Sequence, residues 1–181
     1  GGGLRPITDN AYDLGSSSQR YAQAYISDGI FFGSETSDHL DTYEFGTWNP
    51  VYQTSNGDGT FTHDIQAGYY VKVGRLVFAS FRLRTDSVGS PTGNLQLGGL
   101  PFPAVNVATA SSGGTLSVGR ASTFLGGDVP ISGDVQDNGS YVNLRKQSTA
   151  GGNYTNSVAS DLGTTTNDND LSGTVIYRSA S

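Results

Sequence analysis

Few residues in this sequence could support covalent catalysis. Nucleophilic catalysis needs a Ser, Thr or Cys beside a base, and that base is most often a histidine. The chain has no Cys, no G-x-S-x-G motif and only two histidines, His39 and His63. His39 lies in a polar stretch and His63 in an expected strand, where a lone histidine is more often a surface or packing residue. We therefore predict no catalytic residues and expect a protein that is not an enzyme.

Carboxylates are the second group that could do chemistry. Glycoside hydrolysis requires two of them about 5–10 Å apart across the sugar. The chain has 16 Asp and Glu residues, so a coincidental pair is easy to form. Most of the Asp residues stand next to Gly, Asn or Ser, where their side chains support turns through hydrogen bonds to the backbone. These positions favour a structural role for the carboxylates.

One segment has part of a metal-binding pattern. Residues 168–173, Asp-Asn-Asp-Leu-Ser-Gly, match the opening of a calcium loop. The acid expected six residues after the Gly is missing, because position 179 is Ser. We therefore predict no metal site and no cofactor, and hold calcium at Asp168 and Asp170 as an open question.

Polar loops are the expected place for recognition of a sugar. Recognition residues usually lie on loops that a rigid scaffold displays, and aromatic rings can stack on sugars while amides hydrogen-bond to hydroxyls. Polar loops are expected at 111–114, 136–140, 150–157 and 163–170. The candidate receptor-binding residues in or beside them are Tyr141, Asn153, Tyr154 and Asn156.

The elements that must position these loops are expected to be strands. The chain has 26 Gly and, by count, only two Lys and two Glu, which favours turns over helix surfaces. Eight or nine short apolar runs alternate with turn residues from Thr47 to Tyr177. This rhythm predicts an all-β protein, with a jelly-roll-like antiparallel β-sandwich at residues 41–181.

The clearest hairpin joins residues 69–73 to 76–81 across Gly74-Arg75. Glycine first in a two-residue loop is typical of a type II′ turn. This turn pairs Val71 with Phe78 on one face and Tyr70 with Ala79 on the other. Because both faces carry apolar groups, the hairpin is predicted either to be covered on both sides or to lie at a subunit interface.

Residues 1–40 are predicted to form a neck that joins copies of the chain. Ser16 and Gln19 have the spacing of a capping box, which predicts a short helix over 19–25. The segment is too short to bury its own apolar residues, so we expect it to pack against another copy of itself. The candidate interface residues are Tyr21, Tyr25, Phe31, Phe32 and Tyr70.

Charge and hydropathy exclude two classes of partner. The formal net charge is −6 and 14% of the residues are charged, whereas nucleic-acid binding needs clustered Lys and Arg. No apolar run approaches the roughly 18 residues of a membrane-spanning helix.

The sequence begins Gly1-Gly2-Gly3 without Met or a signal peptide, so we expect a fragment of a longer chain.

Three motifs resemble segments of bacteriophage tail fibres and tailspikes. The stretch from Leu4 to Ile26 resembles their DN-x-Y-D-L-G-S segment, with Tyr21 where a Trp usually stands. Residues 43–50 are similar to the EGTW-x-P that opens many fibre end-domains. Residues 68–77 and 100–102 are similar to the G-x-Y-x-K-x-G-x-L-V and L-P-F that follow in those domains.

The resemblance implies a homotrimeric tip at the distal end of a virion tail fibre, attached to the rest of the fibre. Residues 1–40 would be its trimerising neck, with the threefold axis running through them. Its expected function is to bind a bacterial cell-surface receptor during adsorption, a glycan or another outer-membrane component. The resemblance carries over no binding residues, because receptor loops diverge most between fibres. The alternatives are a glycan-depolymerising enzyme of the tailspike type and a purely structural trimerisation or decoration module.

Overall fold

The chain divides into two compact units, Gly1–His39 and Leu40–Ser181, one residue before the predicted boundary. No helix among the described residues is long and apolar enough to cross a membrane. Phe32, a predicted interface residue, lies outside the described part. The computed structural model describes residues 7–8, 13–27, 29–31, 39–40, 42–107, 113–147 and 152–181.

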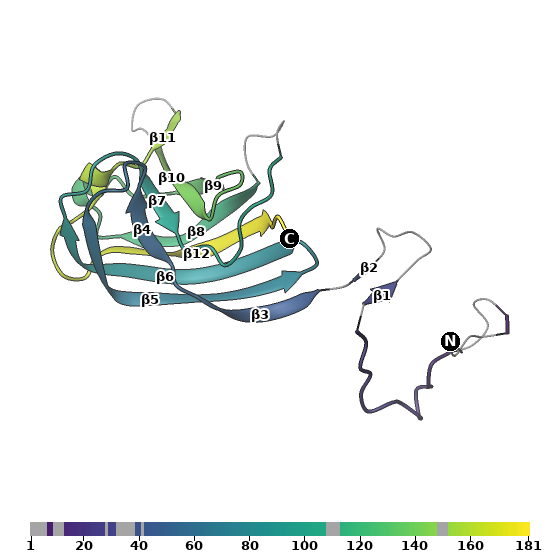
Figure 1. Cartoon of the computed structure of the whole chain (residues 1–181). Helices are drawn as coiled ribbons and strands as arrows, with labels where there is room; N and C mark the ends of the chain where they lie inside the picture. Colours follow the sequence, from purple (N-terminus) through teal and green to yellow (C-terminus); the bar gives the residue numbers. More distant parts are fainter. Residues whose placement is uncertain are drawn as a thin grey trace. The chain divides into compact units, whose positions relative to one another are not determined.

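Antiparallel strands build almost all of the second unit (Figure 1), which confirms the prediction of an all-β, sandwich-like fold. Short 3₁₀ turns, η2 and η3, lie in its connections, and no α-helix occurs in the described residues. In chain order the elements of the whole chain are β1 (Ile30–Phe31), β2 (His39–Leu40), β3 (Tyr43–Trp48), β4 (Val51–Thr54), β5 (Thr60–Val73), β6 (Leu76–Gly89), β7 (Leu95–Gly98), β8 (Gly114–Ser122), η2 (Leu125–Gly127), β9 (Ser132–Val135), β10 (Tyr141–Gln147), β11 (Tyr154–Asn156), η3 (Ala159–Asp161) and β12 (Asp168–Arg178).

One continuous sheet curls to form the sandwich. Its strand order is β3-β5-β6-β12-β8-β9-β10-β7-β4, with β11 paired to β10. The two edge strands, β3 and β4, are consecutive in the chain and joined only by Asn49 and Pro50. Gln66 of β5 donates a hydrogen bond to the Pro50 carbonyl at 3.0 Å. This short link brings the two edges of the sheet together, so the inner faces of its two halves enclose one core.

The central hairpin has the predicted register. Val73 pairs with Leu76, Val71 with Phe78 and Tyr70 with Ala79 across β5 and β6. Gly74 has a φ of 55°, as the first position of a type II′ turn requires. The turn fixes the pairing of two 14-residue strands, because a slip of one residue would exchange their inward and outward side chains.

Trp48 closes the core where the sheet curls. Its indole is 6% exposed and packs edge-on against Phe81, with ring centroids 5.9 Å apart. Its Nε1 donates to the Ser80 carbonyl at 3.1 Å. Gly68 lies opposite Trp48 in β5, and a Cβ there would stand 2.5 Å from the indole nitrogen. The tryptophan of the fibre-like motif is therefore a core residue whose ring needs a glycine beneath it.

The two ends of the sandwich carry different parts of the chain. The hairpin end holds the Gly74–Arg75 turn, the start of β3 and the C-terminal residues, since Ser179 donates to the Arg75 carbonyl at 2.8 Å. The loop end holds the turns 55–59, 90–94, 123–131 and 157–167. The chain enters the sandwich at the hairpin end, since Tyr43 at the start of β3 pairs with Val73 beside the Gly74–Arg75 turn.

The helix predicted over 19–25 does not form. Residues 13–27 are described, and none of them is helical. The Ser16 hydroxyl does accept a hydrogen bond from the Gln19 amide at 3.0 Å, but the Ser16 amide also donates to the Gln19 carbonyl at 2.8 Å. These bonds close a tight turn instead of a helical one. Two helical turns are too short to be stable in water without tertiary packing, and Tyr21 and Tyr25 are exposed.

Candidate functional site

The structure divides the predicted receptor-binding residues between the two ends of the sandwich. Tyr141 begins β10 opposite Gly98, whereas Gln147 ends β10 opposite Tyr154. Six residues of strand separate the two positions, or about 20 Å at about 3.3 Å per residue. Tyr141 is half-buried and Tyr154 is 67% exposed. The two tyrosines therefore cannot belong to one small site.

The predicted loops divide in the same way. The described parts of loops 111–114 and 136–140 lie at the hairpin end, where Gly113 accepts from Arg178 and Gly139 accepts from Ala104. The described parts of loops 150–157 and 163–170 lie at the loop end. Only this second pair is placed away from the point where the chain enters.

Of the residues around β11, Asn153 and Tyr154 are free to meet a ligand, and Asn156 is not. The Asn156 side chain accepts a hydrogen bond from the guanidinium of Arg145. Arg145 in turn donates from Nε to Asp134 at 2.5 Å. Asn156 therefore helps to fix β11 on β10, while Asn153 and Tyr154 are exposed beside it.

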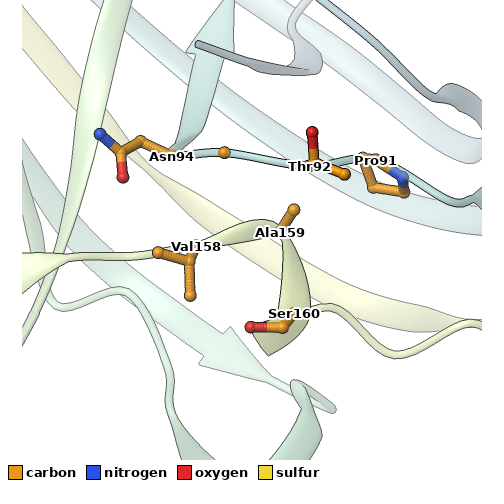
Figure 2. A pocket seen from close by; sticks show the side chains of 7 residues that line it. Pro91, Thr92, Asn94, Val158, Ala159 and Ser160 are labelled. Carbon is orange, nitrogen blue, oxygen red and sulfur yellow. The ribbon is translucent and has the colours of Figure 1, made fainter. Parts of the chain in front are cut away.

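An open groove of about 390 Å³ lies at the loop end. Residues 91–94 form one side of it and residues 158–160 the other (Figure 2). Backbone bonds fix the two sides, because Leu95 donates to the Ser157 carbonyl at 2.8 Å and Ala159 donates to the Gly93 carbonyl at 2.9 Å. The lining residues are Pro91, Thr92, Gly93, Asn94, Val158, Ala159 and Ser160.

A lysine whose side chain is 16% exposed supports the groove from the inside. Lys146 Nζ lies 2.7 Å from Asp161 Oδ1 and 2.9 Å from Asp128 Oδ2. The other carboxylate oxygen of Asp161 accepts from the Val158 amide at 2.9 Å. Asp161 is 5% exposed, so its charge is balanced inside the fold. Asp128 and Asp161 thus both bind Lys146, so this pair of carboxylates stabilises the fold beside the groove.

A row of polar side chains on the outer surface was not anticipated from the sequence. Gln53 donates to Gln96 at 3.0 Å, Gln96 to Asn143 at 3.1 Å, and Asn143 to Asp134 at 3.3 Å. These residues lie directly opposite one another on β4, β7, β10 and β9. The available signal was their alternation with apolar residues in V-Y-Q-T, L-Q-L-G and Y-V-N-L. The row gives this half of the sandwich a polar outer face.

The same row of paired positions continues across β8 to the other half of the sandwich, where its outward side chains are apolar. Outward side chains of β3, β5, β6 and β12 form what we call the apolar face, and each is between 39% and 72% exposed. Phe45 pairs with Val71, Val71 with Phe78, and Phe78 with Ile176. The apolar face consists of Tyr43, Phe45, Tyr69, Val71, Val73, Leu76, Phe78 and Ile176.

Tyr70 does not share the apolar face. Its ring packs edge-on against Phe102 with a centroid separation of 5.2 Å. Its hydroxyl donates to Glu44 at 2.5 Å. Alternation along β5 therefore turns Tyr70 inward and its neighbours Tyr69 and Val71 outward. Of the other predicted interface residues, Tyr21 and Tyr25 are exposed, at 69% and 92%, and Phe31 lies in β1.

His63 is a packing residue in the structure. His63 stacks on the buried ring of Tyr52, with centroids 6.2 Å apart and planes at 25°. Burial lowers the pKa of His63 below its ordinary value, so its neutral form packs here. His39 lies in β2.

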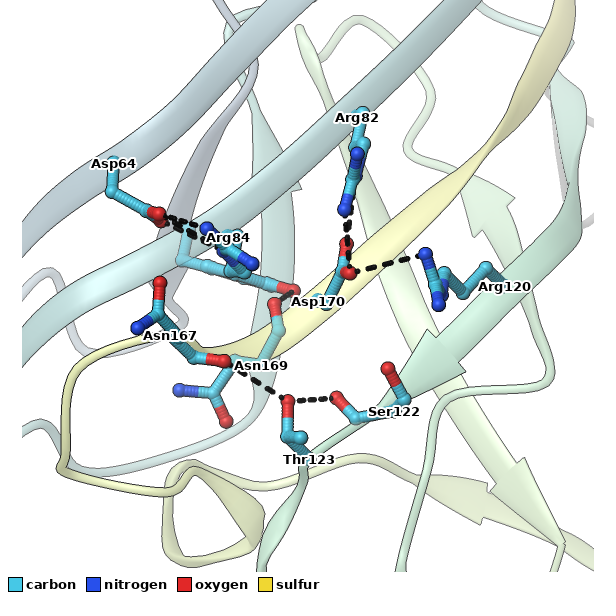
Figure 3. Close-up of polar contacts among 10 residues, drawn as sticks. Asp64, Arg82, Arg84, Arg120, Ser122, Thr123, Asn167, Asn169 and Asp170 are labelled. Carbon is cyan, nitrogen blue, oxygen red and sulfur yellow. Dashed lines mark hydrogen bonds and ion pairs between the residues drawn. The ribbon is translucent and has the colours of Figure 1, made fainter.

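A charged cluster lies on the outer face of β6, β12 and β8 near the loop end (Figure 3). Arg82 donates to Asp170 through Nε at 3.1 Å and Nη2 at 2.9 Å. Arg120 approaches the same carboxylate from the opposite side, with Nη1 3.5 Å from Oδ2. Arg84 forms a bidentate pair with Asp64 beside them. Asp170 is 5% exposed beneath its two arginines.

These contacts show how the partial calcium-loop motif is used. Asp170 binds guanidinium groups, and Asp168 Oδ2 accepts from the Thr165 amide at 2.9 Å and hydroxyl at 2.7 Å. The two carboxylates therefore serve different partners. Across the described ranges, no three His, Asp or Glu side chains gather in a way that could hold a metal ion.

Acid is expected to destabilise the fold through Asp170. Hydrogen bonds from Arg82, then the charges of Arg82 and Arg120, hold the pKa of Asp170 below its ordinary value of about 3.9. The stabilisation is present above that value and is lost as pH falls through the lower, folded-state pKa. In urea titrations between pH 6 and pH 2, Asp170→Asn should show a smaller decrease in unfolding free energy below pH 4 than the unaltered protein. An equal decrease would contradict this assignment.

Comparison with protein-family models, with curated proteins and with solved structures finds no match to this chain.

Proposed function

We propose that this chain is the receptor-binding tip of a bacteriophage tail fibre, which attaches to a bacterial surface glycan as a homotrimer and performs no chemistry itself. The observation that carries the proposal is the division of the sandwich surface. Exposed apolar side chains gather on the apolar face, whereas exposed polar and aromatic side chains lie at the loop end, away from the point where the chain enters the sandwich. The fibre-like motifs in residues 4–26 and 43–102 support the same proposal.

The apolar face is suited to contact between copies of the chain. Fully exposed aromatic side chains present about 150–250 Å² each, so eight half-exposed apolar side chains present on the order of 800 Å². The largest apolar patch on a typical monomer is about 300–600 Å², and one partner of a standard interface contributes about 800 Å². The area therefore fits a second copy, and the fibre resemblance favours three copies around one axis.

The loop end is suited to contact with a sugar. Tyr154 offers an exposed ring and Asn153 offers an amide. One side of the groove, residues 158–160, begins two residues after the end of β11. A single sugar site is weak, because sugar hydroxyls exchange well-made hydrogen bonds with water for those with protein. Three linked copies would raise the apparent affinity by about 10²–10⁴ through avidity.

Adsorption to cells tests the proposed function. Fluorescently labelled full chain is added to a panel of Gram-negative and Gram-positive strains, before and after the cells are treated with periodate or with protease. We expect saturable binding to some strains, its loss after periodate cleavage of sugar diols, and its survival after protease. Binding that survives periodate and is lost to protease would replace the glycan with a protein receptor. Release of reducing ends from purified surface polysaccharide would show an enzyme instead.

Tyr154→Ala is expected to lower adsorption and leave stability unchanged. The side chain is 67% exposed, so its loss should alter the free energy of unfolding by less than about 0.5 kcal/mol. Removal of an aromatic contact should weaken each site about fivefold or more. Binding to a responsive strain and urea unfolding are measured in parallel.

Leu125→Ala is the matched control, since Leu125 is 59% exposed at the same end. This variant should leave adsorption unchanged. A loss of about 3 kcal/mol or more in Tyr154→Ala, with normal adsorption of the folded protein, would show that Tyr154 is a packing residue.

A further inference from the structure

We propose that Arg82 and Arg120 form a binding site for an anionic group, a carboxylate or a phosphate, on the outer face of β6, β12 and β8. The inference goes beyond the proposed function, because it adds a site for a charged ligand that is built from other residues than Tyr154 and the groove. It rests on that function only for the source of the anion.

The strand register brings the two arginines together. Ser172 of β12 pairs with Arg82 of β6 on one side and with Arg120 of β8 on the other. An irregularity in the pairing of β12 with β8, between Ser172 and Gly173, sets this position of Arg120. Neighbouring strands lie about 4.8 Å apart, so the Cα atoms of the two arginines are about 10 Å apart. Side chains of this length can converge on one small anion across that gap.

Asp170 preorganises the pair without saturating it. The carboxylate takes two of the five N–H donors of Arg82. Among the described residues, its 3.5 Å approach to Arg120 is the one ion pair of that guanidinium. The side chains of Arg82 and Arg120 are 43% and 58% exposed, while that of Asp170 is 7% exposed. Asp170 therefore holds both guanidinium groups in place while their remaining N–H donors face solvent. This order in the free protein lowers the entropy lost when a ligand binds.

The local charge favours an anion although the chain as a whole is acidic. Arg82, Arg84 and Arg120 surround the carboxylates of Asp64 and Asp170, which leaves one positive charge in the cluster. The formal net charge of the chain is −6, so this patch opposes the average. Asp168 is the next carboxylate along β12, and it is bound to Thr165.

A guanidinium fork matches both carboxylates and phosphates in a bidentate geometry. On a bacterial surface glycan these groups would belong to a hexuronic acid or to a phosphate substituent. Two probes separate the sources. Glucuronate tests binding of a carboxylate, with glucose as the uncharged control. Inorganic phosphate tests binding of a phosphate group.

The full chain is titrated with each probe while the Nε–Hε signals of its arginines are followed by NMR. We expect saturable shifts of the Arg82 and Arg120 signals with glucuronate, with phosphate or with both, and none with glucose. Arg120→Gln should weaken the affinity about tenfold, as expected for loss of a charge-assisted contact. Arg120→Lys, which keeps the charge and loses the fork, should fall between the two.

Arg178→Gln is the matched control, because it removes the same charge from an exposed position of β12 near the hairpin end. It should bind like the unaltered protein. The inference is overturned if neither anion shifts the Arg120 signal, if glucose shifts it equally, or if Arg178→Gln and Arg120→Gln weaken binding alike.

Cell adsorption separates failure of this site from failure of the proposed function. If the chain adsorbs to cells and Arg120 does not respond to either anion, only the anion site is wrong. If the anions bind at Arg120 and no strain adsorbs the chain, the anion site stands and the proposed function is wrong.

Discussion

Phe78→Asp is expected to reduce the mass of the protein in solution from three times the chain mass of 18.9 kDa to a single chain. Phe78 lies near the centre of the apolar face, between Val71 and Ile176, and is 50% exposed in the isolated chain. A carboxylate there would be desolvated without a partner in any assembly that buries this face, which costs several kcal/mol per copy. Size-exclusion chromatography with light scattering at micromolar concentration measures the mass.

The fold itself should survive Phe78→Asp, because the side chain points away from the core. Circular dichroism should therefore show the β spectrum of the unaltered protein. Ser117→Asp is the control, since Ser117 is exposed on the outward face of β8, outside the apolar face. It should remain trimeric. A mass of 18.9 kDa for the unaltered protein would contradict trimerisation, and a trimeric Phe78→Asp would place the interface elsewhere.

Asn169→Ala is expected to cause the largest loss of stability of any change discussed here, about 4–6 kcal/mol. Asn169 is fully buried with a φ of 57° at the irregularity in β12. Its side chain donates to Thr85 at 2.7 Å and to the Gly163 carbonyl at 2.8 Å, and accepts from the Gly163 amide at 2.8 Å. Each buried group left without its partner costs about 1–3 kcal/mol, and Ala in the left-handed region costs about 1–2 kcal/mol more. Urea unfolding at pH 7 measures the loss.

Two other variants separate these contributions. Asn167→Ala changes an exposed residue with a φ of 66°, so it should lose only about 1–2 kcal/mol from the backbone conformation. Asn169→Gly keeps the left-handed conformation and should lose mainly the hydrogen-bond contribution. A loss below 1 kcal/mol in Asn169→Ala would mean that water or local rearrangement replaces the three bonds.

The central hairpin shows which features local sequence can determine. Gly74 fixes the turn, and the turn fixes the pairing of Val71 with Phe78. Alternation then determines, for each side chain of β5 and β6 near the turn, whether it points inward or outward. These interactions join neighbours in sequence, so their pattern was predictable. Alternation of short apolar runs similarly predicted the all-β fold.

The helix over 19–25 shows where a local signal is too weak. The Ser16–Gln19 spacing predicts a capping box, and a hydrogen bond of that pattern is present. It closes a turn, because the choice between a turn and a helix depends on packing that seven residues cannot supply.

The sequence by itself determined the strand rhythm, the register of the central hairpin and the apolar character of both faces of that hairpin. Tertiary structure alone decided which residues meet between strands that are distant in the sequence. Asn169 finds Thr85, Asp170 finds Arg82 and Arg120, and Tyr141 is separated from Tyr154. The physical reason is that the curled sheet pairs β12 with β6, about 90 residues earlier in the chain. Side-chain periodicity reports which face a residue occupies, but it carries no information about which distant strand lies beside it.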